Sequence, residues 1–235
     1  MTVDEVMAEL QSHGSESIKK ILLKHGVKEP FFGVKVEYLK TIQKKAKKDY
    51  PLAKGLYATG NADAMYLAGL ITDDGKMTKA DLQTWVEQAV STNINEYTVP
   101  WVATESNYGF ELGLEWIDSP QEHIAAAGWS TLANLATLKA DSDLDIPAYR
   151  ALLQRVVKDI HTAPNRVTAR MNIFVITVGS YVAPLTEDAK AAANKIGAVY
   201  VNTEGTACKV PDAIEYINKA ITRGTLGKKK KTVKC

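Results

Sequence analysis

Apolar positions recur at intervals of three and four residues along most of the chain, which is the periodicity of amphipathic α-helices. The segments with this pattern are Ser17–His25, Val34–Lys48, Ala62–Ile71, Lys79–Ala89, Gln121–Leu138, Ile146–Ile160, Arg166–Val182 and Pro211–Ile221. Short breaks rich in Gly, Pro or Asp separate them, and Pro51 and Pro120 suit the first turn of a helix. Alternating strand patterns are missing, apart from a brief extended stretch over Ala198–Val201. The pattern predicts an all-α protein.

Three of these helices contain clusters of small residues, at residues 63–70, 123–129 and 167–172. Small side chains let neighbouring helices approach closely. The clusters lie roughly 45 to 58 residues apart, which is typical of HEAT-type helix-pair repeats. We therefore expect a HEAT-like (ARM-type) superhelix, a curved stack of antiparallel helix pairs with a concave binding side. Residues 1–227 are expected to form one such domain, and residues 228–235 a basic tail.

The helix Arg166–Val182 carries two apolar stripes and is therefore expected inside the stack. The stripes are Val167, Met171, Phe174, Val175 and Val178, and Ala169, Ile173 and Ile176. Arg166 and Arg170 lie four residues apart and share a face with Thr177. Charged groups on a largely buried helix need partners or an open groove. Two interpretations stay open, namely internal ion pairs and a basic row facing a phosphate backbone.

Charge is unevenly distributed along the chain. Residues 19–48 hold ten lysines and two acids, and residues 218–235 hold seven basic residues and no acid. These two segments together carry +15, whereas the remaining 12 basic and 25 acidic residues give −13. Such polarisation favours a polyanionic partner, although solvated lysine-rich faces would give the same count.

Several classes of protein do not fit the sequence. No apolar run approaches the roughly 20 residues that cross a bilayer, and the N-terminus lacks a signal-peptide core, so a cytoplasmic protein without a membrane partner is expected. The four histidines and two cysteines show neither metal-ligand nor disulfide spacing. Gly-rich phosphate loops and strand–helix alternation are also missing, so we expect no metal, nucleotide or other cofactor.

The chain resembles the DNA alkylation repair (AlkD-type) family. The resemblance rests on Phe31-Phe32-Gly33-Val34-Lys35, the Ala-Gly-Leu helix near residue 69 and residues 121–129, and it extends over about residues 15–222. Residues 163–166 and 206–216 resemble a divergent subgroup. The family's fold is a curved stack of HEAT-like helix pairs whose basic concave face holds duplex DNA. The resemblance implies a glycosylase that releases cationic N3- or N7-alkylated purines and needs no cofactor, with a carboxylate that stabilises developing positive charge.

Residue-by-residue transfer of the family's site is only partial. Alignment on Val99-Pro100 places Glu96 where the resemblance implies the catalytic aspartate. Thr92 and Ile176 stand where the resemblance implies two tryptophans, and Ala126 stands where it implies an arginine.

Other candidate DNA-binding residues lie nearby or follow from charge. They are Asn93, Asn95, Trp101, Trp129, Arg166, Arg170, Lys209, Lys228, Lys229, Lys230 and Lys231. Lys209 precedes an expected helix start at Pro211, where exposed N–H groups favour a phosphate. Tryptophans such as Trp101 and Trp129 are more often core or interface aromatics than DNA contacts. Like-charge repulsion predicts an open, mobile tail that settles on DNA by counterion release.

Three functions follow from these observations. The first is a DNA-binding member of this family, with or without alkylpurine glycosylase activity, acting on damaged duplex DNA. The second is a non-catalytic binder of damaged, bent or branched DNA, which the replaced side chains favour. The third is a HEAT-repeat scaffold for protein partners, which an acidic or apolar groove would indicate.

Overall fold

The structure, a computed structural model, describes residues 1–203, 205–206 and 208–234. Every regular element within these residues is helical, which confirms the predicted fold class. By their internal contacts they form two compact units, one of Met1–Tyr108 with residues 205–206 and 234, and one of Gly109–Thr203 with residues up to Val233. No helix in the described ranges combines the length and hydrophobicity that a membrane span requires. The single domain over residues 1–227 stays a prediction.

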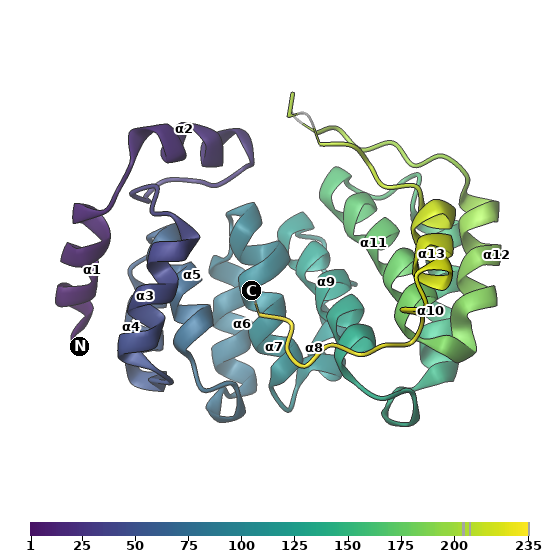
Figure 1. Ribbon diagram of the computed structural model, residues 1–235, viewed down its shortest axis with the longest axis horizontal. Helices are drawn as coiled ribbons and strands as arrows, with labels where there is room; N and C mark the ends of the chain where they lie inside the picture. The colour runs from purple at the N-terminus through teal and green to yellow at the C-terminus, as the bar shows by residue number, and fades with distance from the viewer. Residues whose placement is uncertain (204, 207, 235) are drawn as a thin grey trace. The chain divides into compact units, whose positions relative to one another are not determined.

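The first unit contains seven α-helices among its described residues (Figure 1). They are α1 (Val3–Ser12), α2 (Glu16–Lys24), α3 (Val36–Ala46), α4 (Tyr50–Ala58), α5 (Ala62–Ile71), α6 (Lys79–Gln88) and α7 (Val99–Glu105), with a 3₁₀ turn η1 (Asp74–Lys76) and a π-helical turn η2 (Ile94–Thr98). Capping side chains fix several starts. Asn61 accepts from the backbone of Asp63 and Ala64, and Thr78 forms a capping box with Asp81.

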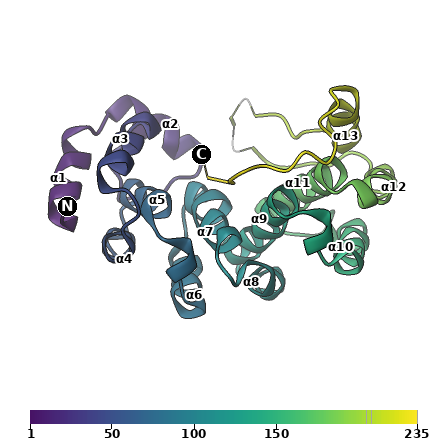
Figure 2. The same cartoon turned by 60° about the horizontal axis from the view of Figure 1, so that its bottom comes forward.

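The described residues of the second unit form six α-helices, seen turned by 60° in Figure 2. They are α8 (Gly109–Trp116), α9 (Glu122–Leu138), α10 (Ile146–Asp159), α11 (Asn165–Tyr181), α12 (Thr186–Ile196) and α13 (Ala213–Thr222), with 3₁₀ turns η3 (Asp141–Asp143) and η4 (Ala183–Leu185). α8 pairs with α9, and α11 packs against α9, α12 and α13. The central position that the sequence predicts for α11 is therefore confirmed.

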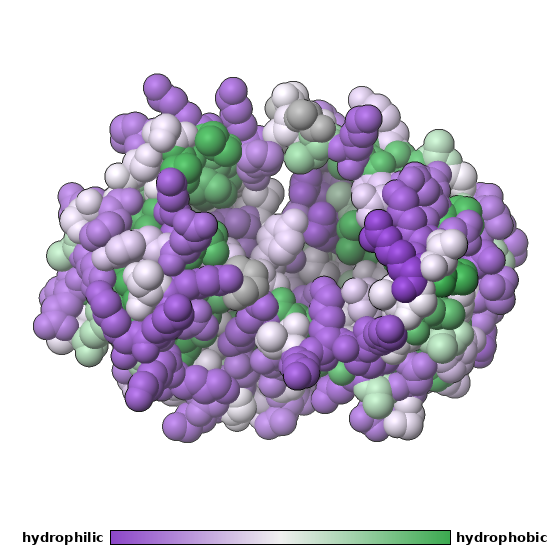
Figure 3. All heavy atoms as spheres, in the orientation of Figure 1, coloured by the Kyte–Doolittle hydropathy of each residue, from purple (hydrophilic) through white to green (hydrophobic). Residues whose placement is uncertain are grey.

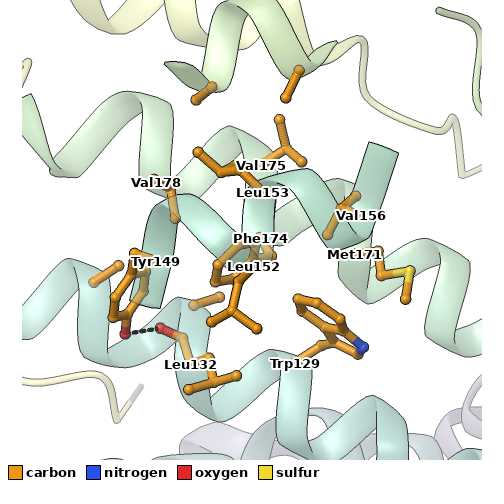
Figure 4. Packing of buried hydrophobic residues seen from close by; sticks show 14 of the residues in the cluster. Trp129, Leu132, Tyr149, Leu152, Leu153, Val156, Met171, Phe174, Val175 and Val178 are labelled. Carbon is orange, nitrogen blue, oxygen red and sulfur yellow. Dashed lines mark hydrogen bonds between the residues drawn. The ribbon is translucent and has the colours of Figure 1, made fainter. Parts of the chain in front are cut away.

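The core of the second unit lies between α9, α10 and α11 (Figure 4). Phe174 packs edge-on against Trp129, with ring centroids 5.2 Å apart, and stacks on Tyr149 at 5.8 Å. The Tyr149 hydroxyl donates to the carbonyl oxygen of Leu132 over 2.8 Å, so its burial leaves no lost hydrogen bond. Of the second predicted stripe of α11, only Ile176 is buried, whereas Ala169 and Ile173 are half-buried.

Asp63 on α5 holds the loop that carries the Phe-Phe-Gly-Val motif. Its carboxylate accepts the backbone N–H groups of Phe32, Gly33 and Val34 at 2.7, 2.9 and 3.3 Å. Burial raises the pKa of Asp63, and these three hydrogen bonds offset part of that rise. The loop that sets the direction of the lysine-rich α3 is therefore fixed by a buried acid on another helix.

We expect Asp81→Asn to lower the free energy of unfolding at neutral pH. Asp81 accepts from the Tyr50 hydroxyl at 2.6 Å and pairs with Lys54 at 2.6 Å. Partial burial opposes ionisation, but hydrogen bonds from Lys54, Tyr50 and Thr78 hold the pKa of Asp81 well below its usual range. A loss of about 1–2 kcal/mol is expected at pH 7. A lowered pKa stabilises the fold above the unfolded-state value, so the wild-type advantage should shrink below about pH 4.

Urea unfolding between pH 7 and pH 3 measures this difference. Asp4→Asn, at an exposed carboxylate in the first turn of α1, is the control with little expected effect. An Asp81→Asn deficit that grows as the pH falls would contradict the assignment.

Candidate nucleic-acid interface

Glu96 lies in the π-helical turn η2, which runs directly into α7. Pro100 has no N–H group, so the carbonyl of Glu96, four residues earlier, receives no helical bond from it. The N–H of Val99 reaches back five residues to Ile94, and the Thr98 hydroxyl donates to the carbonyl of Asn93 over 3.1 Å. The proline thus explains why the chain widens into a π-turn at the candidate carboxylate.

The side chains around this turn are more buried than the sequence suggests. Glu96 is 3% exposed and Asn95 4% exposed, and the Asn95 amide donates to the carbonyl of Ala89. Asn93 is half-buried, and its Oδ1 atom, sheltered from solvent, accepts no hydrogen bond from the described residues. Of these candidates, Asn95 is a structural residue rather than a DNA contact in this conformation.

Aromatic rings surround the start of α7. Trp101 is 6% exposed and meets Tyr66 of α5 edge-on, with centroids 5.4 Å apart. Tyr97 lies 6.2 Å from Trp101 and is 45% exposed. The ring that could meet a ligand is therefore that of Tyr97. Tyr97 was not among the residues expected from the sequence, although its place beside Glu96 was a usable signal.

Thr92 holds the C-terminal end of α2 beside η2 through two hydrogen bonds. Its backbone N–H donates to Gly26 over 3.2 Å, and its hydroxyl donates to the carbonyl of His25 over 2.5 Å. A Cβ on Gly26 would lie 2.8 Å from the Thr92 methyl group. One residue earlier, the Ser91 hydroxyl accepts the N–H of Lys28 at 2.8 Å. The lysine-rich segment is thus anchored next to η2.

Exposed cations gather on and after α2. Lys20, Lys24 and Lys28 are all exposed, whereas Lys19 pairs with Glu29 at 2.9 Å. None of the nine residues of α2, all of them described, is buried. Figure 3 shows apolar atoms among hydrophilic ones over this helix, where Ile21 and Leu23 are 52% and 46% exposed.

Trp129 belongs to the core and does not face a ligand, which corrects one interpretation of it. It is fully buried, against Phe174 and beneath the Arg155 guanidinium, which lies 5.8 Å from its ring. Ala126 and Ile176, which stand where the resemblance implies an arginine and a tryptophan, are also buried. A large side chain at the fully buried Ala126 would need space that the packed core does not contain, whereas Ile176 lines a cavity.

α11 connects the two segments that resemble the divergent subgroup. Asn165 donates to the carbonyl of Asn202 over 3.0 Å and accepts its N–H over 2.7 Å. About two turns further along α11, the side chain of Asn172 donates to the carbonyl of Pro211 over 2.9 Å. In the segment after α12, Asn202 and Pro211 are therefore held by two asparagines of one helix, which also carries the half-buried Arg166 and Arg170.

Lys209 is exposed within this segment, but it does not adjoin a helix start. α13 begins at Ala213 rather than Pro211, and its N-cap Asp212 accepts the N–H of Glu215 over 2.8 Å. A carboxylate already occupies the position where the helix N–H groups would attract a phosphate. The helix-terminus argument for Lys209 is therefore wrong, and its charge alone supports a role.

The basic tail is held against the second unit, contrary to the expected open chain. The Lys229 ammonium donates to the carbonyl of Ala136 and pairs with Asp141, both at 2.8 Å. The N–H of Lys230 donates to Thr137 over 2.8 Å, and its ammonium lies 5.7 Å from the Tyr181 ring. Free carbonyls at the C-terminal end of α9 attract cations, which local charge counting along the tail does not reveal. Lys228 and Lys231 are exposed.

The described residues contain no group of three or more His, Cys, Asp or Glu side chains placed to hold a metal ion.

Comparisons with known proteins bear on these features. The family described as DNA alkylation repair enzyme matches residues 6–217. Uncharacterized proteins of Listeria monocytogenes and Listeria innocua are each 31% identical over 228 residues, covering 95% of this chain and 99% of the relative. A solved structure is 37% identical, with a TM-score of 0.92 and full coverage of both chains. It is described as a new family of proteins related to the HEAT-like repeat DNA glycosylases with affinity for branched DNA structures.

The family match covers most of the chain, and the likeness to the solved structure covers all of it. Both agree with the motifs that first suggested the resemblance and with the all-helical fold. The chain therefore belongs to the DNA alkylation repair enzyme family.

Proposed function

We propose that this protein binds branched DNA and does not excise alkylated bases. The solved relative at 37% identity has affinity for branched DNA structures. In this chain the exposed Lys20, Lys24 and Lys28 offer a cluster of cations of the kind that binds phosphates. Branch points bring phosphates of several strands together, so they suit a cationic surface that reads shape rather than base sequence.

The contacts of Thr92 are the main support for the proposal that the protein does not excise bases. The resemblance implies a tryptophan here, yet Thr92 ties the end of α2 through its backbone and its hydroxyl. Its methyl group already fills the space beside Gly26. An indole at this position would displace α2, so the residue supports the lysine-rich segment instead of packing on a sugar.

A glycosylase is the second candidate because one carboxylate is kept. Glu96 lies in the turn that also presents the exposed Tyr97. A buried carboxylate near an aromatic ring is one way to stabilise a developing oxocarbenium ion. Its 3% exposure means that catalysis would require this turn to open.

Binding to a four-way junction and to a duplex of equal length and sequence composition tests the proposal. The junction should bind more tightly, and its affinity should fall by about tenfold or more between 50 and 200 mM salt because phosphate contacts release counterions. Replacing Lys20, Lys24 and Lys28 together by alanine should weaken junction binding by about tenfold or more for the same reason. Lys158→Ala with Lys195→Ala, at exposed lysines of α10 and α12, is the control.

Incubation with methylated duplex DNA tests the second part of the proposal, that alkylated bases are not excised. The wild type should release neither 7-methylguanine nor 3-methyladenine. Release by the wild type that is lost in Glu96→Gln would overturn the proposal in favour of the glycosylase. Equal binding of junction and duplex, insensitive to salt, would remove the DNA function.

A further inference from the structure

A cavity in the second unit lies between α11, α13 and the tail. Its volume is about 430 Å³, and its chemically distinctive lining residues are Tyr181, Tyr216, Lys219, Arg223, Lys228 and Lys230. This volume falls within the range of about 300–1,000 Å³ that is usual for small-ligand sites. The cavity lies outside the η2 region, and its lining includes Ile176, which stands where the resemblance implies a tryptophan.

All the charged residues that line the cavity are positively charged. Four cations line it, and no acidic residue is among its lining residues. Lys219 pairs with Glu215 at 2.5 Å, whereas Arg223 and Lys228 form no ion pair with any described acidic residue. Cations left without counterions around one cavity favour an anionic ligand.

Two tyrosines give the cavity an aromatic component. Tyr216 is 47% exposed, and the Lys219 ammonium lies 4.9 Å from its ring. Tyr181, at the end of α11, lies under the Lys230 ammonium. Figure 3 shows hydrophilic residues gathered over α13, the helix that carries Tyr216 and Lys219. Aromatic rings beside cations are how proteins hold unpaired nucleotides, with the base on the ring and the phosphate on the cations.

The fold holds these groups in place. α13 is anchored by the fully buried Ile217, which packs against Gly179 of α11. The chain then turns back, and the N–H of Gly227 donates to the carbonyl of Ser180 over 3.0 Å. With Lys229 fixed on α9, the flanking Lys228 and Lys230 are presented at the cavity by a tethered segment.

We infer that this cavity binds an unpaired nucleotide of a DNA strand, with its phosphate on Arg223 and Lys228 and its base on Tyr216. Bases of a continuous duplex are stacked on their neighbours and offer no free face, so the cavity selects single-stranded arms or ends. The inference deepens the proposed function and rests on it, because branched DNA is where such an arm would reach this protein.

Binding of fluorescent hexathymidylate to the full chain tests the inference. The matched probes are an abasic oligomer with the same phosphates and a hexaglutamate peptide. Hexathymidylate should bind more tightly than either, and Tyr216→Ala should weaken it about tenfold, within the range of about 1–3 kcal/mol per stacked base. Arg223→Ala should weaken hexathymidylate and the abasic oligomer alike. Tyr216→Phe keeps the ring and should bind normally.

The controls separate this inference from the proposed function. Tyr216 is half exposed, so its truncation should leave the thermal unfolding temperature unchanged. Junction binding without hexathymidylate binding would overturn the cavity assignment and leave the proposed function standing. Hexathymidylate binding without junction binding would overturn the proposed function and leave the cavity assignment standing. Equal affinity for hexathymidylate and the abasic oligomer, or for hexaglutamate, would refute the nucleotide assignment.

Discussion

Gly128→Ala is expected to destabilise the second unit by about 2 kcal/mol or more, although alanine normally favours a helix over glycine by about 1 kcal/mol. Gly128 lies where α9 crosses α8. A Cβ there would lie 2.7 Å from the backbone nitrogen of Ile117 and 3.0 Å from the carbonyl oxygen of Gly113. Backbone atoms cannot move aside as the end of a side chain can, so the two helices would have to separate.

Gly55→Ala in α4 is the matched control for this prediction. A Cβ at Gly55 would meet only one methyl group of Val3, which can shift. Urea unfolding of both variants should therefore show Gly55→Ala neutral or slightly stabilised and Gly128→Ala clearly destabilised. Equal effects would mean that the close approach of α8 and α9 contributes little.

Asp63→Ala should lower the free energy of unfolding by about 3 kcal/mol or more, because buried N–H groups without acceptors cost about 1–3 kcal/mol each. The change removes the acceptor for Phe32, Gly33 and Val34. Asp63→Asn keeps one oxygen and should lose less. Urea unfolding followed by tryptophan fluorescence measures the series.

Asp49→Ala measures the cost of losing an ordinary acceptor in the same unit. Asp49 caps α4 by accepting one N–H, that of Leu52, at 3.0 Å, so about 1 kcal/mol is expected. If Asp63→Ala lost no more than this control, the three hydrogen bonds would not act together. Loosening of the loop should also weaken junction binding, since it joins α2 to α3.

The predicted helices were reliable where apolar contrast along the sequence is strong. α5 has the predicted bounds, and α6, α9, α10 and α11 differ from the prediction by a residue at one or both ends. α12 was missed because its buried face consists largely of Ala189, Ala192 and Ala193, which differ little in hydropathy from their surroundings. α7 was missed because Pro100 turns the chain before it into a π-turn, which breaks the 3.6-residue period.

The candidate site was predicted less well than the fold. The sequence identifies a carboxylate at Glu96, but not that it is buried, because helix periodicity does not register the π-turn in which it lies. It also does not show that Trp129 is enclosed by Phe174 and Arg155, since those partners come from other helices.

The sequence by itself determined the helical class, the repeat-like use of small residues, the family and the uneven distribution of charge. The family follows from the resemblance of its motifs, and the other three follow from periodicity, residue size and counts, which are properties of neighbours along the chain. Only the tertiary structure decided which cations remain available. Lys229 is taken up by the end of α9, whereas Lys228 and Arg223 converge on a cavity, because burial and ion pairing depend on residues far apart in sequence.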